Sequence, residues 1–333
     1  MTKENSLSVR QEYMDIFRGF GIILMVMGHV NFGSRFDFFI HAFHMPMFFV
    51  ISGFFFPSAM DVTLSNFVRK KARTLLFPYI VFGLCHYLIN LLLYPEKGID
   101  PLMHLLFVNT TNMPIAGALW FLTALFLTEC FYFLINRYIS NEVIKHIIII
   151  GIAVLGNCIN EILTFTLPYA MGTAMVGVGL FHIGFLMRKC EHSRFMNHIL
   201  NMPILEWLVC AVVTVLLIFH GGYVNMRLNT YEPILPFWIN AILAVIIGIN
   251  CSKYVYRFMC HTYLCQCLCS IGRNSIIYLC LNELSILIVV QYFPHLFKSW
   301  LPAQIYTFCL SLIILQLCRL LFTKTKLKVF LGR

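Results

Sequence analysis

Long apolar stretches alternate with short polar segments along the whole chain. Apolar runs of about 17 to 22 residues, the length that crosses the hydrocarbon core of a bilayer, recur throughout. They lie near residues 14–33, 41–59, 76–94, 117–136, 146–163, 168–187, 203–220, 233–250, 274–292 and 303–322. The pattern predicts an all-α, polytopic integral membrane helix bundle of about ten transmembrane helices.

The basic residues predict how this bundle is oriented. Cytoplasmic loops of membrane proteins carry an excess of Lys and Arg. If both termini are cytoplasmic, nearly all of the 24 lysines and arginines lie inside, and those left outside are Arg35, Lys97, Arg227 and Lys298. We therefore expect a short cytoplasmic N-terminus (1–13) and a basic cytoplasmic tail (323–333).

Composition agrees with a membrane protein. Hydrophobic residues make up 60% of the 333 residues and charged residues 11%, against about 25% charged in soluble domains. The net charge of +10 follows from the cytoplasmic loops, so we expect no nucleic acid partner. The longest polar pieces, an outer loop at Tyr94–Ala116 and an inner loop at Cys251–Arg273, are too short for a core of their own. We expect a single membrane domain over 1–333 and no appended soluble domain.

The first apolar stretch carries two residues that are costly in lipid, Arg18 and His29. Eleven residues make about three helical turns, so the two side chains share one face about 16 Å apart along the axis. Asp15 precedes Arg18 by one turn, close enough for an ion pair. Charged residues within membrane helices usually mark a functional path, although an Arg near a helix end also reaches the headgroups by snorkelling.

Further segments follow this helix in a fixed order. They are His44-Met45-Pro46-Met47-Phe48-Phe49-Val50-Ile51-Ser52-Gly53, Arg73-Thr74-Leu75-Leu76-Phe77-Pro78-Tyr79, Leu119-Trp120-Phe121-Leu122 and Ile271-Gly272-Arg273-Asn274-Ser275. Together with Arg18 and His29 they resemble the membrane acyltransferase-3 family from Tyr13 to about Asn282. The opening segment is most similar to the branch typified by fucose 4-O-acetylases.

The resemblance implies an O-acyltransferase of the bacterial inner (cytoplasmic) membrane. It would move an acetyl group from acetyl-CoA to a hydroxyl of a cell-envelope or exported glycan, or of its lipid-linked precursor. The expected partners are therefore an acyl-CoA, a glycan or lipid-linked sugar and membrane lipid, with no permanently bound cofactor.

The expected catalytic residues are His29 and Arg18, because an imidazole can take a hydroxyl proton and an Arg can hold phosphates or an oxyanion. Candidates for the substrate and donor site are Asp15, His44, Ser52, Trp120, Glu129, Arg73, Arg273, Asn274 and Ser275. Many relatives have a histidine after the Asn-Ser segment, whereas this chain has Asn282 and Glu283. No second catalytic histidine is predicted there.

Some of these residues have structural alternatives. Trp120, at the start of an apolar stretch, is also typical of an interfacial belt. Glu129 lies deep in that stretch and serves either structure or function. His29, His41 and His44 could supply three imidazoles to a metal, but only Asp37 is near enough to orient the last two, and we expect no metal site.

Two other functions compete with acyl transfer. In a transporter or flippase of a lipid-linked sugar, Arg18, His29 and Glu129 would line a conduction path. Transporters often show paired Gly- or Pro-broken helices in their two halves, and the sequence contains no convincing pair. A non-catalytic scaffold would leave the same three residues unexplained.

Overall fold

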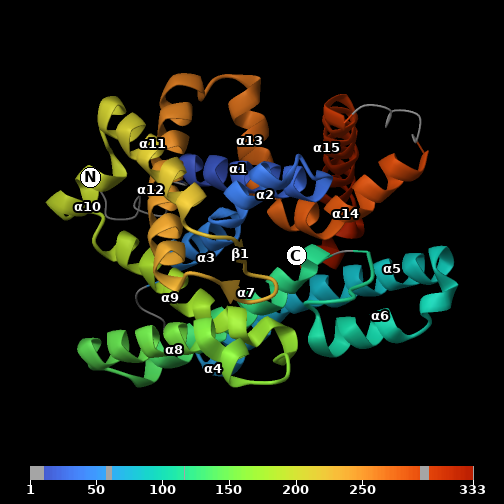
Figure 1. Cartoon of the computed structure of the whole chain (residues 1–333), viewed down its shortest axis with the longest axis horizontal. Helices are drawn as coiled ribbons and strands as arrows, with labels where there is room; N and C mark the ends of the chain where they lie inside the picture. Colours follow the sequence, from blue (N-terminus) through green and yellow to red (C-terminus); the bar gives the residue numbers. More distant parts are fainter. Residues whose placement is uncertain (1–10, 58–61, 116, 293–299, 333) are drawn as a thin grey trace.

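A computed structural model describes residues 11–57, 62–115, 117–292 and 300–332 and shows a bundle of helices (Figure 1). The α-helices are α1 (Glu12–Val30), α2 (Ser34–His41), α3 (His44–Phe54), α4 (Leu64–Lys71), α5 (Phe77–Leu93), α6 (Asp100–Met103), α7 (Trp120–Tyr138), α8 (Glu142–Ile162), α9 (Met171–Lys189), α10 (Arg194–Leu200), α11 (Ile204–His220), α12 (Ile234–Met259), α13 (Tyr263–Arg273), α14 (Ser275–Tyr292) and α15 (Trp300–Lys324).

Shorter elements connect these helices. The π-helical segments are η1 (Ala72–Leu76) and η3 (His104–Val108). The 3₁₀ segments are η2 (Pro95–Lys97), η4 (Gly117–Leu119), η5 (Pro168–Ala170) and η7 (Lys326–Leu331). One antiparallel hairpin, β1 (Val224–Asn225) and β2 (Thr230–Tyr231), lies between α11 and α12.

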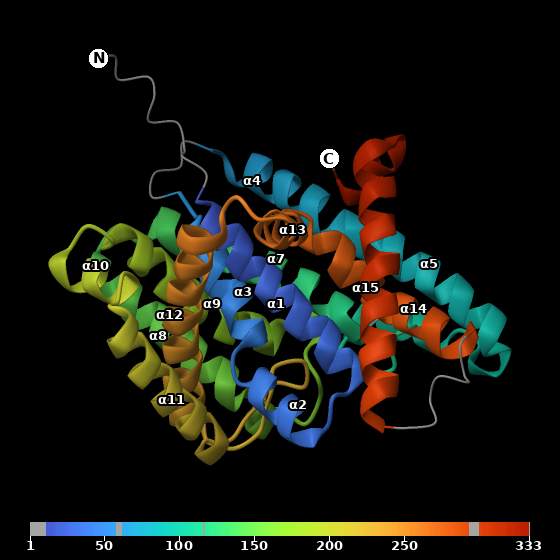
Figure 2. The ribbon, with the colours of Figure 1, turned by 90° about the horizontal axis from the view of Figure 1, so that it is seen from above.

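The prediction of a polytopic all-α membrane bundle is confirmed. Within the described residues, 9 spans are long and apolar enough to cross a membrane, and the α10–α11 pair, bent by 75°, brings the number to 10. These spans follow the predicted apolar stretches in order. The two ends of the bundle differ: Figure 2 shows α2 at one edge and the start of α1, α4 and the end of α15 at the opposite edge.

The charge pattern orients these two edges. The last turn of α4 carries Arg69, Lys70 and Lys71, so the edge with α4 is assigned to the cytoplasm. The edge with α2 and the β-hairpin is then the outer one. "Inner" and "outer" are used below in this sense.

Helices α3 and α9 touch backbone to backbone near the centre of the bundle. A Cβ atom on Gly53 of α3 would lie 1.8 Å from the carbonyl oxygen of Phe181, and one on Gly184 of α9 would lie 1.9 Å from that of Val50. Only glycine permits this approach, and small residues are the usual means of packing helices in membranes. The contact fixes α3, which carries His44 at its outer end and Ser52 near its inner end.

The expectation of an inner loop at Cys251–Arg273 was wrong. Helix α12 continues to Met259, and α13 then lies against α1. A Cβ atom on Gly272 would lie 1.9 Å from the carbonyl oxygen of Asp15, which shows how closely the two helices approach. The cause is an amphipathic pattern, because Cys265, Leu268, Cys269 and Ile271 bury one face of α13.

The predicted stretch 41–59 also differs in detail. The helix begins earlier, at Ser34, and is interrupted between His41 and His44. Pro46 falls in the first turn of α3, where the amide hydrogen that proline lacks would have had no helical partner. The proline therefore favours a new helix start instead of a continuous span.

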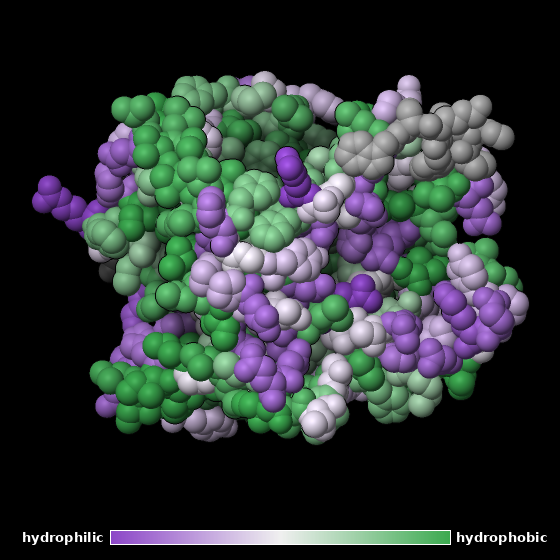
Figure 3. All heavy atoms as spheres, in the orientation of Figure 1, coloured by the Kyte–Doolittle hydropathy of each residue, from purple (hydrophilic) through white to green (hydrophobic). Residues whose placement is uncertain are grey.

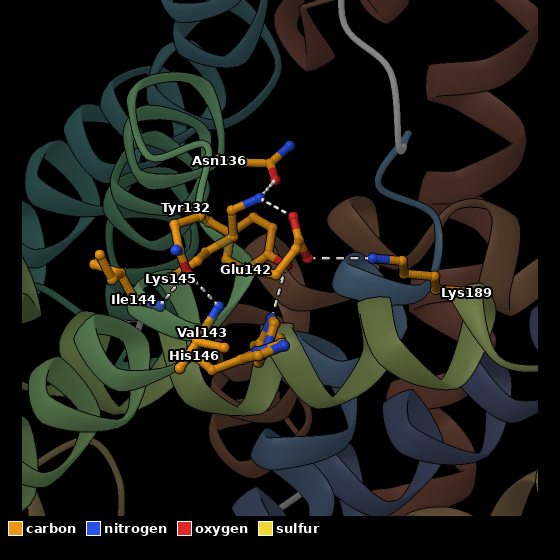
Figure 4. A network of polar contacts seen from close by, with 10 residues as sticks. Tyr132, Asn136, Glu142, Val143, Ile144, Lys145, His146 and Lys189 are labelled. Atoms are coloured by element: carbon orange, nitrogen blue, oxygen red, sulfur yellow. Dashed lines mark hydrogen bonds and ion pairs between the residues drawn. The ribbon is translucent and has the colours of Figure 1, made fainter.

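A polar network joins the inner ends of α7, α8 and α9 (Figure 4). Glu142 accepts hydrogen bonds from Lys145 at 2.7 Å and from Lys189 at 3.2 Å. Further hydrogen bonds link Lys145 to Asn136, Tyr132 to His182 and His182 to His146. The network spans three helices and ties the α7–α8 connection to the end of α9.

The glycine contact between α3 and α9 gives a stability prediction. Gly53→Ala would force the two backbones apart, and overpacking of this kind costs about 1–3 kcal/mol. The matched control is Gly151→Ala in α8, where an added Cβ meets nothing within 4 Å. We expect a lower midpoint of thermal unfolding in detergent for Gly53→Ala and an unchanged or higher one for Gly151→Ala. Equal midpoints would show that the close approach is absent in the protein.

Candidate functional site

An outer cavity of about 240 Å³ lies where α1, α2, α3, η4, the β-hairpin and α14 meet. Figure 3 shows one face of the molecule, across the middle of which hydrophilic residues gather. The polar and aromatic side chains that line the cavity are His29, Asp37, His41, His44, Trp120, Tyr223, Asn225 and Arg227. The cavity therefore combines imidazoles, a guanidinium and a carboxylate at the outer end of the bundle.

His29 lines the outer cavity and is paired with Glu283 behind it. Nδ1 of His29 lies 3.2 Å from Oε1 of Glu283 on α14. Oε2 of Glu283 accepts a hydrogen bond of 2.8 Å from the backbone N–H of Gly117, which fixes the carboxylate. A carboxylate at this distance favours the tautomer with the proton on Nδ1, which leaves Nε2 as an acceptor. The His29 side chain is 32% exposed, so a ligand in the cavity can reach it.

His41 and His44 come from separate helices, yet their ring centroids lie 5.0 Å apart. Nδ1 of His44 donates to the carbonyl oxygen of Ile40 at 2.7 Å, and Nδ1 of His41 to that of Asp37 at 2.8 Å. Because a carbonyl oxygen only accepts, both rings carry the proton on Nδ1 when neutral. The Nε2 atoms of both rings remain as acceptors.

The side chain of Asp37 is held in place by Tyr223. The Tyr223 hydroxyl donates to Oδ2 of Asp37 at 3.0 Å. Burial, together with the charge of Asp37 and this hydrogen bond, raises the pKa of Tyr223 to about 12. Tyr223 is therefore a neutral hydrogen-bond donor near neutral pH, and it joins the β-hairpin to α2.

Arg227, in the connection between β1 and β2, brings a positive charge to the outer cavity. Its Nε donates to the carbonyl oxygen of Thr110 at 2.6 Å. A Cβ atom on Gly117 would lie 2.4 Å from Nη1 of Arg227 and 3.0 Å from Oε1 of Glu283, so both side chains rest against this glycine. Burial lowers the pKa of Arg227 and the charge of Glu283 opposes this, but the guanidinium stays protonated near neutral pH.

A second cavity, of about 400 Å³, lies at the inner end of the bundle. Its polar lining consists of Arg18, Ser52, Lys70, Lys71 and Glu129. Lys71 donates to Oε1 of the buried Glu129 at 2.8 Å, and the Arg18 guanidinium lies 4.8 Å from the centre of the Phe55 ring. Three cations around one carboxylate make this cavity suited to an anionic ligand.

The expected ion pair between Asp15 and Arg18 is present, with 3.7 Å between Oδ1 and Nη1. Asp15 is buried, and its Oδ2 also lies 3.0 Å from Nε of Arg273 at the end of α13. Nη2 of Arg273 lies 3.0 Å from Glu12 as well. This cluster joins α1 to α13, and Arg18 is its one member that lines the inner cavity.

The predicted site residues divide by the cavity that they line: one group lines the outer cavity, a second lines the inner cavity, and the others line neither. The outer cavity takes His29, His44 and Trp120, and the inner cavity takes Arg18, Ser52 and Glu129. Trp120 is 4% exposed, so it lies in the interior and not in an interfacial belt. Arg73, Asn274 and Ser275 line neither cavity.

Sequence reasoning did not assign a site role to Glu283, Arg227, Tyr223 or Lys71. Two signals were present in the sequence. Glu283 is a carboxylate in an apolar stretch, where it needs a partner. Arg227 is one of the few basic residues expected on the outer side of the membrane. Neither signal names a partner, because each pair joins segments that are distant along the chain.

The donor atoms of the outer cavity do not form a metal site. Among the residues described here, no group of three or more His, Cys, Asp or Glu side chains is arranged to hold a metal ion. The Nδ1 atoms of His41 and His44 are used by backbone carbonyls, and that of His29 faces Glu283.

The fold and these cavities define a multi-pass integral membrane protein with polar sites at both ends of its first helix. A family model described as an acyltransferase domain matches residues 11–320, and the chain belongs to this acyltransferase family. Membership makes the protein a membrane O-acyltransferase and favours acyl transfer over transport. No curated protein and no solved structure matches the chain.

The Asp15–Arg273 pair gives a prediction that separates support of the fold from catalysis. Arg273→Leu removes one ion pair of the buried Asp15 and leaves its pair with Arg18, which we expect to cost about 1–3 kcal/mol in the free energy of unfolding. Arg273→Leu with Asp15→Asn should recover part of the loss, because the amide carries no charge. Arg257→Leu, at an exposed Arg of α12, serves as the control. Denaturant unfolding in detergent measures all of them, and equal losses for Arg257 and Arg273 would contradict the pairing.

Proposed function

We propose that the protein transfers an acetyl group from acetyl-CoA to a hydroxyl of a cell-envelope glycan, or of its lipid-linked precursor, at the bacterial inner membrane. One observation carries the proposal. His29, paired with Glu283, lines the outer cavity, at the opposite end of α1 from an arginine that lines a cationic inner cavity. Such an arrangement provides a base where an exported glycan is accessible and an anion site where coenzyme A is present.

His29 supplies the base. With its Nδ1 proton directed to Glu283, Nε2 takes the proton of the acceptor hydroxyl as the oxygen attacks the thioester carbonyl. An oxygen–carbon bond forms, the carbon–sulfur bond breaks, and the proton passes from His29 to the leaving thiolate, which gives coenzyme A. Glu283 stabilises the imidazolium in between, as a carboxylate does in other His-based sites. Transfer through a transient acyl-histidine uses the same nitrogen and the same orientation.

Arg227 supplies the charge that the tetrahedral intermediate requires. Its guanidinium rests beside Glu283 and Gly117 at the outer cavity. A preoriented cation at a developing oxyanion is commonly the largest single contribution to acyl-transfer catalysis. The hydrogen bond from Nε to Thr110 holds the group in place and leaves its terminal nitrogens to face the substrate.

Arg18 supplies the donor site. Together with Lys70 and Lys71 it lines the inner cavity, and an Arg fork binds phosphate through two parallel hydrogen bonds. About 16 Å along α1 separates Arg18 from His29, too far for both to touch one acyl carbon but comparable with the long arm of coenzyme A. Met47 and Phe48 pack against Gly21 between the two ends. We propose that rotation of the flexible Met47 side chain admits this arm.

The experiment that tests acetyl transfer compares envelope glycans by mass spectrometry. Cells with the wild-type protein should show acetyl increments that cells lacking the gene do not. His29→Ala should remove these increments, because His29 is the imidazole that the Glu283 carboxylate orients as the base. Glu283→Gln should lower them at least about tenfold, since the imidazole loses the carboxylate that orients it.

The control is His220→Ala, which changes an exposed histidine at the outer end of α11. We expect its acetylation to equal that of the wild type. Wild-type cells without acetyl increments would refute the proposed function. Full acetylation by the His29 variant would leave the function standing and refute the role of this residue.

A separate prediction concerns the donor. Arg18→Lys should weaken binding of acetyl-CoA roughly tenfold or more, because an ammonium cannot reproduce the bidentate fork. His29→Ala should bind acetyl-CoA like the wild type, since it lies at the other end of α1. Isothermal titration of the purified variants decides this, with Arg194→Lys at the exposed start of α10 as control. Unchanged affinity in the Arg18 variant, or lost affinity in the His29 variant alone, would contradict the assignment of donor binding to Arg18.

A further inference from the structure

A second outer cavity, of about 260 Å³, adjoins the first one. It lies among the α8–α9 connection, the segment after η3 and the β-hairpin. Its polar lining is made of Thr110, Thr111, Asn160, Thr164, Thr166, Thr173, Asn229 and Arg227. Of these residues, Arg227 and the carbonyl oxygen of Thr110 that anchors it belong to the chemistry proposed for His29.

Arg227 connects the two outer cavities, because its side chain lines both. The hydrogen bond from its Nε to the carbonyl oxygen of Thr110 anchors it at this boundary. A ligand that reaches Arg227 from the first cavity therefore stands at the entrance of the second. The cavities are neighbours on one continuous outer face.

The second cavity has a rigid floor. Thr173 donates to the carbonyl oxygen of Met226 at 2.6 Å, and Nδ2 of Asn229 to that of Gly156 at 2.8 Å. Asn160 holds the hairpin in the same way through Leu228 at 2.9 Å. These bonds connect α8, α9 and the hairpin, so the floor is preorganised for a ligand.

The rim of the cavity is different from its floor. The segment Leu163-Thr164-Phe165-Thr166-Leu167 alternates hydroxyl and apolar side chains. Thr164 and Thr166 are exposed, and Phe165 is 62% exposed. No acidic side chain belongs to the lining, whose single charged member is Arg227.

This composition fits a carbohydrate. A sugar ring presents hydroxyl groups around its edge and C–H bonds on its faces, so it needs both hydroxyl or amide partners and an apolar surface. Threonine hydroxyls and the Asn160 amide offer the first, and the Phe165 ring offers the second. A lipid chain would instead require a lining that is apolar throughout, whereas hydroxyl and amide side chains make up much of this one.

The volumes of the two outer cavities indicate a ligand that is larger than either cavity alone. Small-molecule pockets usually measure about 300–1,000 Å³. Each outer cavity is smaller than this range, at about 240 and 260 Å³, whereas the two taken together fall within it. A ligand that fills the site would therefore extend from one cavity into the other past Arg227.

We infer that the acceptor is an oligosaccharide or longer glycan and not a single sugar. The unit that receives the acyl group occupies the His29 cavity, and a neighbouring sugar unit binds in the second cavity against Thr164, Thr166 and Phe165. This inference rests on the proposed function and adds the length of the acceptor to it.

The test measures how acceptor length affects acyl transfer. Envelope glycan from cells that lack the gene, whose acceptor hydroxyls are not acetylated, is partially hydrolysed and separated into fragments of one, two and three sugar units. The wild-type protein in lipid nanodiscs then transfers labelled acetyl from acetyl-CoA to each fraction. We expect kcat/KM to rise from one unit to two or three.

The variant with Thr164→Val and Thr166→Val removes both rim hydroxyls without breaking any hydrogen bond described among the residues of this cavity. Each neutral hydrogen bond contributes about a factor of 2 to 12 in affinity, so KM for the longer fragments should rise roughly fivefold or more. Neither kcat nor the KM of the single unit should change. Thr230→Val, at an exposed threonine of β2 outside the cavity, is the matched control and should resemble the wild type.

The possible outcomes separate the two proposals. If the wild type transfers acetyl neither to these fragments nor to the unfragmented glycan, the proposed function fails. If it transfers acetyl equally well to one unit and to three, the function stands and the second sugar site is refuted. A fivefold rise in KM for the single unit in the double variant would also refute it, because that unit does not reach the rim.

Discussion

The free-energy cost of an unpaired charge within a membrane constrains this bundle more than any other factor. The buried carboxylates of Asp15 and Glu129 lie beside Arg273 and Lys71, and Glu283 lies beside His29. Each pair joins helices that are distant along the chain. The polar side chains that the chemistry needs are therefore also the ones that determine how α1, α13, α14 and the α4–α7 region come together.

The sequence allowed the helices to be predicted but not which helices pack against one another. Apolar length and basic loops are local signals, and they placed Arg18 and His29 at opposite ends of one helix. The contact between His29 and Glu283 depends on how α14 packs on α1, which no local pattern contains. The helix α13 was missed for a related reason: its apolar face consists partly of cysteines, and it is too short to resemble a membrane span.

For the candidate site, too, the sequence indicated residues but not how they are arranged. Trp120 had two readings, and its burial beside the outer cavity decides between them. His41 and His44 were expected on one helix, whereas a helix break brings their rings together from two. Arg227 belongs to no sequence motif, and the sequence distinguished it only as one of the few basic residues outside the membrane. Loop residues that enter a cavity have no periodicity, so only the folded chain identifies them.

The backbone contact between Gly53 and Gly184 has a mechanical consequence. Helix α3 contributes Ser52 to the inner cavity and His44 to the outer one, and its seat against α9 leaves no space for sliding. Because α3 is held in this way, the walls that it contributes to the two cavities keep a fixed separation. The bundle therefore sets the distance between the outer and the inner cavity through one rigid helix.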